Sequence, residues 1–559
     1  MSEKLLIGWG EVDVTPSENG KKIPLYGQYY PRLAEKIHSR LKVTVCAMSS
    51  GSEHFITGSI DGVGCPVQVT ERIRQEVGAI EKEIDPSKIF LNAIHSHSAP
   101  SLGFQKNPSP GTGIASRKWF DLRDVAITPE EYADFAIPLI VNAIVNAWRS
   151  RRPGGIASGF GNARVGHCRR AVYANGTAEM YGDTTRPDFI GMETSEDTGV
   201  EMLFTLDEQG KRTGLFLNVA CPSQNMESTY MVSSDFAGAT RERLKEAYGE
   251  DFRMIYQISP AGCQSPRDLV RHYTTEPDFW HADGVVVLAE RLFNAVQTAV
   301  VGEADYTPVL KSTSFEVALP RRRVSYTDWK NAKAEVERLC AIMPEDEAYK
   351  AFCDELHAKE KLDGPGPYDS KLHHFVLIQN AKAVIARYEN QDASPELFFD
   401  MNVVRLGNIA IASNPFELYL VYGQNIKARS HAFQTFLVQL SNGAKNFHAG
   451  YLPSPEAERY GGYGGLVING QVGSDGGYKL ADITVEAINK LFDCLFTHRI
   501  QIRISIEFRG TLRKVKIAAD QSFFLRKCII KFDSSVGNNV FPFKNCRKTC
   551  KRRAFVMEF

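Results

Sequence analysis

The sequence predicts an α/β (α+β) layered fold, in which mixed β-sheets are flanked by helices and carry a helical insertion. Short β-prone apolar runs alternate with longer segments of helical periodicity through the first 300 residues. Such alternation is typical of domains in which helices cover a sheet. The composition is also that of a globular chain, with 43% hydrophobic and 24% charged residues among 559. A chain of this length buries a large core.

The strands expected in the first part of the chain are short apolar runs, most of which end near Asp, Pro, Gly or small hydroxyl residues. They are residues 5–14, 41–48, 55–60, 89–94, 157–165, 200–206, 214–220 and 254–258. Helical periodicity is expected over residues 67–80, 129–150, 236–248 and 284–301. Thr128 followed by Pro129 gives the second helix a clear start, because Thr caps a helix and Pro suits its first position.

Residues 326–390 change character, being rich in Ala, Glu, Lys and Leu. We interpret them as a helical insertion of two or three helices joined by the turn at 364–367. Sheet signals resume at 398–406 and 409–412, and a helix follows Glu417. A strand at 436–440, a Gly/Tyr-rich loop at 449–465 and a final helix at 482–492 complete the main unit. Residues 108–123 carry turn residues and are expected to form a surface loop.

The charge distribution separates residues 1–492 from a basic C-terminal extension at 493–559. The extension holds 15 Lys/Arg against 5 Asp/Glu, whereas the whole chain is balanced at 66 of each. A balanced chain gives no reason to expect nucleic acid or a membrane surface as a partner. The alternating Ile and Arg of residues 499–506 can form a strand. We interpret the extension as an appended segment rather than a nucleic-acid arm.

The eleven cysteines form no paired framework, which favours reduced thiols over disulfides. The apolar run at the amino terminus is too short for a signal sequence, and no run of 18 apolar residues is present. These features predict a cytoplasmic protein without a membrane span. The oligomeric state does not follow from the sequence.

One strand ends in a segment suited to chemistry. The apolar run 89–94 stops at His95-Ser96-His97-Ser98-Ala99-Pro100. The carboxyl ends of strands in α/β sheets are where ligands gather. On a continuing strand His95 and His97 would point to the same face, spaced for one metal ion or one proton relay. Further metal-capable groups beside or close to Pro or Gly are Cys221, Glu417 and Tyr451.

Four blocks of the sequence resemble the neutral/alkaline (non-lysosomal) ceramidase family, in that family's order and across residues 5–490. They are Gly8-Trp9-Gly10-Glu11-Val12-Asp13-Val14-Thr15-Pro16, the His95–Pro100 block, Cys263-Gln264-Ser265-Pro266, and Gly450-Tyr451-Leu452 through Gly462. The resemblance implies a zinc-dependent hydrolase that cleaves an amide (N-acyl) bond in a small-molecule or lipid-like substrate. The family's immunoglobulin-like domain is not recognisable in residues 493–559.

The resemblance implies four ligands for Zn²⁺, namely His95, Cys221, Glu417 and Tyr451. Cys221 departs from the family, which has His at this place. Thiolate is a good zinc ligand. It brings more negative charge than imidazole, however, so a zinc-bound water should be less acidic than in a His-rich site.

The resemblance also implies catalytic roles. His97 would transfer protons, Arg169 would face the substrate, and Ser265 corresponds to the family's active-site serine. The oxyanion-donating tyrosine corresponds to Tyr463 by spacing or to Tyr460 by context. Either His97 activates water as general base, or Ser265 attacks directly to give an acyl-enzyme.

Two other functions remain open at this stage. Cys221 could be the nucleophile of a metal-free hydrolase, with His95 or His97 as its base. Alternatively, the chain is a catalytically inactive ceramidase-like protein with a binding or structural role. Metal content separates these alternatives from the zinc hydrolase.

Overall fold

The computed structural model describes residues 3–17, 20–27, 32–103, 125–270, 280–358, 373–492, 503–509, 512–518 and 555–558. The loop expected at 108–123 and the turn expected at 364–367 lie outside these residues. The chain divides into two compact units, Met1–Leu491 and Phe492–Phe559.

The larger unit is built on a mixed sheet that contains nine strands within the described residues. Eight of them follow the order β16-β14-β13-β8-β1-β5-β6-β7, and β18 pairs with β8. Most neighbours are antiparallel, but β6 and β7 are parallel, as are β14 and β16. The strands are β1 (Leu6–Asp13), β5 (Lys42–Ser50), β6 (Glu53–Ile60), β7 (Ile89–Ala93), β8 (Arg152–Asn162), β13 (Gly199–Asp207), β14 (Arg212–Val219), β16 (Arg253–Ile258) and β18 (Val300–Val301).

A second sheet has the order β19-β20-β21-β23. Its strands are β19 (Leu310–Pro320), β20 (Glu396–Leu406), β21 (Ile409–Ser413) and β23 (Gln434–Val438). Buried apolar side chains of both sheets form one cluster, in which Phe55, Phe216 and Ile255 of the first sheet meet Val404, Ile411 and Phe436 of the second. The two sheets therefore pack face to face around a shared core.

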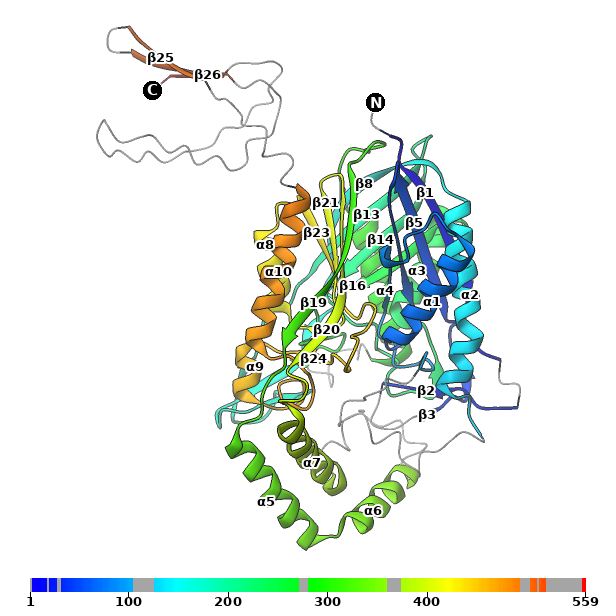
Figure 1. Ribbon diagram of the computed structural model, residues 1–559, viewed down its shortest axis with the longest axis vertical. Coiled ribbons are helices and arrows are strands. Elements are labelled where there is room, and N and C mark those ends of the chain that lie inside the picture. The colour runs from blue at the N-terminus through cyan, green and yellow to red at the C-terminus, as the bar shows by residue number, and fades with distance from the viewer. Residues whose placement is uncertain are drawn as a thin grey trace. The chain divides into compact units, whose positions relative to one another are not determined.

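Helices cover the outer faces of the two sheets (Figure 1). On the first sheet, α1 (Val67–Ile80) and α2 (Pro129–Arg149) pack on one half, and α3 (Asp235–Tyr248) and α4 (His281–Gln297) on the other. On the second sheet, α10 (Ser474–Phe492) runs along the outer face. Layers of helix, sheet, sheet and helix result, which confirms the predicted layered fold class.

Thr128 caps α2 as expected. Its side chain accepts a hydrogen bond from the Glu131 N–H, and the Glu131 carboxylate accepts one from the Thr128 N–H.

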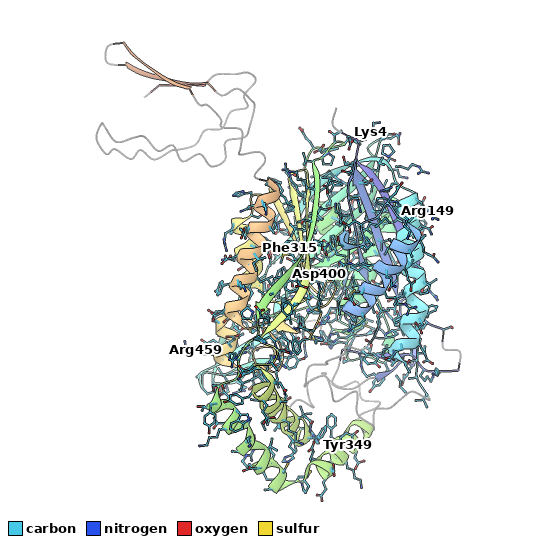
Figure 2. The ribbon with its side chains drawn as sticks, in the orientation of Figure 1. Lys4, Arg149, Phe315, Tyr349, Asp400 and Arg459 are labelled. Atoms are coloured by element: carbon cyan, nitrogen blue, oxygen red, sulfur yellow. The ribbon has the colours of Figure 1, made fainter. Side chains whose placement is uncertain are left out.

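An ion pair links α1 to the second sheet. Asp400 of β20, labelled in Figure 2, lies 3.2 Å from Arg74 of α1 and 2.6 Å from Lys445. Helix α1, which packs on the first sheet, is thus also tied to a strand of the second sheet.

The helical insertion comprises α5 (Tyr326–Ile342), α6 (Glu345–Ala358) and α7 (His374–Asn390). Its helices share a small apolar cluster that includes Leu339, Phe352 and Phe375. Remaining short elements are β2 (Pro24–Leu25), β3 (Arg32–Leu33), β4 (Lys36–Ile37), a 3₁₀ turn (Pro86–Lys88), β9 (His167–Cys168), β10 (Arg170–Tyr173), β11 (Ala178–Met180), β12 (Phe189–Met192), β15 (Met231–Val232), β17 (Gln264–Ser265), β22 (Glu417–Leu418), α8 (Leu420–Arg429), β24 (Tyr451–Leu452) and α9 (Pro455–Tyr460).

In the second unit, β25 (Arg503–Arg509), β26 (Leu512–Ala518) and β27 (Phe555–Glu558) form an antiparallel sheet. The strand expected at 499–506 coincides with β25 from Arg503 onward, and residues 499–502 lie outside the described residues. Within the described residues, no helix combines the length and the apolar character that crossing a bilayer requires.

Candidate functional site

The site begins where β7 ends. Ile94 donates its N–H to Ile60 O at 3.0 Å, and Ser96 donates to Gly62 O at 3.1 Å. Between them His95 adopts a left-handed backbone, with φ of +65°. The expectation that His95 and His97 share one face of a continuing strand is therefore wrong, because the strand ends at Ala93. The tight turn nevertheless brings the two rings together, with centroids 4.7 Å apart.

His95 is oriented as metal-binding histidines usually are. Its Nδ1 lies 2.7 Å from Val63 O, which fixes that nitrogen as the N–H donor. The other ring nitrogen, Nε2, lies 3.7 Å from Oε2 of Glu417. The Nε2 atom of His97 is 3.2 Å from the same nitrogen.

Glu417 and Tyr451 are brought side by side by a parallel bridge between β22 and β24, in which they are register partners. The Glu417 N–H donates to Gly450 O at 3.0 Å. Gly450 is required at this point, because its φ is +65° and a Cβ would lie 2.3 Å from Asn469 O. A carboxylate and a phenol distant in sequence thus reach one place.

Arg169 supplies a buried positive charge to this group. It follows β9 directly, and its side chain is 2% exposed. One Nη2 atom donates to Gly262 O at 3.0 Å and to the Tyr451 hydroxyl at 3.2 Å, and it lies 3.6 Å from Glu417 Oε2. The guanidinium therefore faces both oxygen groups, as expected for an arginine in the site.

The two candidate tyrosines differ in position. The Tyr463 ring packs edge-on against the Tyr451 ring, with centroids 5.6 Å apart, and its pKa is raised by burial and by Glu417. Tyr460 ends α9, and its ring lies beside the Arg459 guanidinium at 6.0 Å. The structure therefore brings Tyr463, rather than Tyr460, against Tyr451.

Ser265 lies on β17, which pairs with β9, the strand that leads into Arg169. It is fully buried, and its Oγ accepts from the Arg267 N–H at 3.0 Å. Tyr181 hydrogen-bonds to the side chains of both Ser265 and Arg169. Tyr181 was not predicted from the sequence, since it follows the short strand β11 and no recognisable motif surrounds it.

Cys221 is oriented differently from the other predicted ligands. Its Sγ donates to Val165 O at 3.2 Å and approaches Pro222 O at 3.5 Å. The side chain is fully buried in the apolar cluster between the first sheet and α3. Burial raises the pKa of this thiol well above its ordinary value. Among the described residues, no hydrogen bond joins its sulfur to His95 or His97.

His97 is held from three sides. Its Nδ1 lies 2.9 Å from Oε2 of Glu227, a carboxyl with no solvent exposure. Arg32 donates one hydrogen bond to His97 O and another to Thr229 O. Gly27 lies against the ring, since a Cβ there would be 2.3 Å from Cγ of His97. Glu227 was missed by sequence reasoning, because it lies in an irregular stretch with no strand end or motif.

The electrostatics of the site keep both imidazoles neutral. Burial lowers the pKa of His95 to about 4 and that of His97 to about 3. Burial also raises the pKa of Glu227 to about 7, against the lowering effect of Arg169 and Arg32. Neutral imidazole is the form that binds metal ions and accepts protons.

Across the described residues, no group of three or more His, Cys, Asp and Glu side chains is arranged to hold a metal ion. The convergent donors comprise instead an imidazole, a carboxylate and a phenol. His95, Glu417 and Tyr451 are therefore the part of the predicted ligand set that the fold brings together.

The fold is similar to that of solved ceramidase structures. One of these, a ceramidase complexed with C2, matches with a TM-score of 0.57 at 14% sequence identity, over 92% of this chain and 84% of that one. The neutral ceramidase from Pseudomonas aeruginosa also matches with a TM-score of 0.57 at 14% identity, over 93% of this chain and 84% of that one. In sequence comparisons, no family model and no curated protein matches the chain. The likeness is thus one of fold.

Proposed function

We propose that this protein is a zinc-dependent hydrolase that cleaves the amide bond of an N-acylated, lipid-like amine. The observation that carries the proposal is the convergence of His95, Glu417 and Tyr451, with His97 and Arg169 beside them. The fold likeness to proteins named ceramidases supports the choice of an amide substrate, since a ceramide is an N-acylated amine.

The donor chemistry fits a catalytic rather than a structural zinc ion. Catalytic zinc is usually held by three protein ligands with one position left open, at bonds of about 2 Å. Two ligands of one such ion lie roughly 3–4 Å apart. The 3.7 Å between His95 Nε2 and Glu417 Oε2 is in this range. Cys221, bonded to Val165 O, is not needed for a three-ligand site.

Zinc, when bound, would polarise the amide carbonyl and make a water acidic enough to attack it. Every other step falls to the chain's own side chains. His97 takes the proton of the attacking water on Nε2 and then gives it to the leaving amine. Arg169 and Tyr463 donate to the oxygen that gains negative charge in the transition state. Ser265, beside Tyr181, is the alternative nucleophile, which would give an acyl-enzyme.

The environment of Cys221 argues against a metal-free cysteine hydrolase. Nucleophilic cysteines need a thiolate, and burial raises the pKa of this thiol. The sulfur also bonds to main-chain oxygen rather than to an imidazole. A zinc site with His97 as the base involves the three side chains that converge, namely His95, Glu417 and Tyr451.

The test combines metal analysis with hydrolysis of a fluorescent N-acyl sphingosine in detergent micelles. We expect one zinc per chain and release of the labelled fatty acid in the parent protein. Glu417→Gln should lose both zinc and activity, whereas Glu316→Gln, at an exposed ion pair on β19, should keep both. Cys221→Ser should keep its zinc. No metal in the parent, or equal metal in parent and Glu417→Gln, would refute the proposal.

A further inference from the structure

The main chain of residues 467–471 lies directly against that of Tyr451. The Tyr451 N–H donates to Asn469 O at 3.0 Å. A Cβ on Gly470 would lie 1.9 Å from Tyr451 O, so only a glycine lets the two backbones come this close. The position of Tyr451 in the candidate site therefore depends on the position of this segment.

The helical insertion holds the segment 467–471 through one buried side chain, that of Arg387 on α7. Its Nη2 atom donates to Gly470 O at 2.7 Å and to Val467 O at 3.2 Å, and its Nη1 atom donates to Oε1 of Gln471. Arg387 is 8% exposed. A guanidinium has five N–H donors in a rigid planar arrangement, so it can fix several oxygens of one segment at once.

Two further arginines gather at the same place. Nε of Arg321 donates to Oε1 of Gln471 at 3.0 Å, and Nη1 of Arg322 donates to Gly465 O at 2.6 Å. Burial, together with the charges of Arg321 and Arg322, lowers the pKa of Arg387 to about 9. Bringing buried cations together opposes folding. Natural proteins accept such local costs mainly at functional sites, which suggests that the position of this segment matters.

We propose that Arg387 is a positioning residue, which holds Tyr451 in the candidate site by fixing the segment 467–471. The inference rests on the proposed function, in which Tyr451 is one of the zinc ligands. It gives the helical insertion a part in that reaction, because α7 supplies the guanidinium and β24 supplies the phenol. Without the guanidinium, the Val467 and Gly470 carbonyls lose their donor, and the segment can move away together with Tyr451.

Hydrogen exchange of the full-length, metal-free protein tests whether Arg387 holds the segment. Arg387→Met removes the hydrogen bonds and keeps an unbranched side chain. The peptide that contains Tyr451 should then exchange its amide hydrogens at least about tenfold faster than in the parent, as measured by mass spectrometry. Arg405→Met on β20 is the matched control. Arg405 is 5% exposed and also donates to main-chain oxygens, those of Gly407 and Leu491, so its loss should leave exchange at Tyr451 unchanged.

Zinc affinity and kinetics test whether the held position matters to the site. Arg387→Met should weaken zinc binding about tenfold, measured by competition with a chelating dye, because a ligand is displaced although none is altered. At saturating zinc, kcat should fall about tenfold with KM little changed. Arg387→Lys keeps the charge and a single donor group, so it should recover part of each loss.

Parental exchange at Tyr451 in a folded Arg387→Met protein would overturn the inference, as would equal changes in Arg387→Met and Arg405→Met. If Arg387→Met does not fold, Arg387→Lys takes its place and must exchange faster at Tyr451 than the parent. If the parent neither binds zinc nor cleaves amides, the proposed function fails, but exchange in the metal-free protein still decides whether Arg387 holds Tyr451.

Discussion

Arg169 donates a 3.2 Å hydrogen bond to the hydroxyl of Tyr451, and the same nitrogen lies 3.6 Å from Glu417. One guanidinium thus faces two groups proposed to hold zinc and stays anchored on Gly262 O at 3.0 Å. A lysine ammonium cannot reproduce this planar arrangement. Arg169 therefore orients the groups of the site by hydrogen bonding and also supplies a positive charge.

Arg169→Lys should lower kcat for amide hydrolysis by about 100- to 1,000-fold, the range for loss of one oxyanion donor. Steady-state kinetics with the fluorescent substrate measure this effect. Arg164→Lys, at the half-exposed pair with Glu196, is the matched control and should change kcat less than twofold. Equal effects of the two substitutions would mean that Arg169 serves stability alone.

The glycine beside His97 gives a second test. Gly27→Ala places a methyl group against the His97 ring and at a φ of +110°, so the ring must move. We expect activity to fall at least tenfold. Gly20→Ala, at a φ of +85° with no atom within 4 Å of the added Cβ, carries backbone strain but no clash. It should leave kcat unchanged, and equal losses would show that backbone strain alone explains the result.

The thiol of Cys221 should resist alkylation in the folded protein. It is fully buried, and its raised pKa leaves little thiolate at pH 8. Cys340 on α5 is half-buried and should react first with iodoacetamide. Peptide mapping by mass spectrometry, before and after denaturation, measures the two rates. Rapid labelling of Cys221 in the native protein would restore it as a candidate nucleophile.

The stability of the protein should respond to the charge of Asp235. This carboxyl is buried at the start of α3, and burial raises its pKa from the ordinary 3.8 to about 6. A raised pKa means that the folded state binds the proton more tightly than the unfolded state. Its stabilising contribution is therefore complete below about pH 4 and is lost as the pH rises to about 6.

Asp235→Asn does not titrate and should escape this loss. Between pH 4 and pH 7 the parent should lose up to roughly 3 kcal/mol relative to the variant, at about 1.4 kcal/mol per pH unit. Urea unfolding of both proteins at the two pH values measures the difference. A difference in unfolding free energy that stays constant with pH would show that Asp235 is already charged throughout this range.

Much of the fold could be predicted because local patterns and packing agree. Helix α1 spans the residues expected from its periodicity, and α2 carries the cap and Pro129 predicted for it. The strand β19 was missed because Leu310–Pro320 mixes polar and apolar residues. The final helix begins at Ser474, eight residues earlier than expected. Its first turn contains Gly476 and Gly477, which are poor helix formers, but Gly477 packs against Tyr422, so tertiary contact overrides local preference.

The site could be predicted only in part. His95 and Glu417 stood at strand ends, where the pattern of Pro and Gly drew attention to them. The left-handed backbone conformation of His95 has no signal in the sequence. The close approach of the two imidazoles, which depends on this conformation, could therefore not be predicted. Glu227 and Tyr181 lie in irregular segments, where one acidic or aromatic residue looks like many others. Their proximity to His97 and Arg169 depends on contacts distant in sequence.

The two packed sheets divide the site between two portions of the chain. The histidines, Arg169 and Glu227 precede residue 300, whereas Glu417 and Tyr451 come from connections of the second sheet. A fragment that stops before β19 would retain the base and the cation but lack the carboxylate and the phenol. Neither fragment alone should be competent, and two separately expressed fragments would regain function only by reassociating through the apolar layer between the sheets.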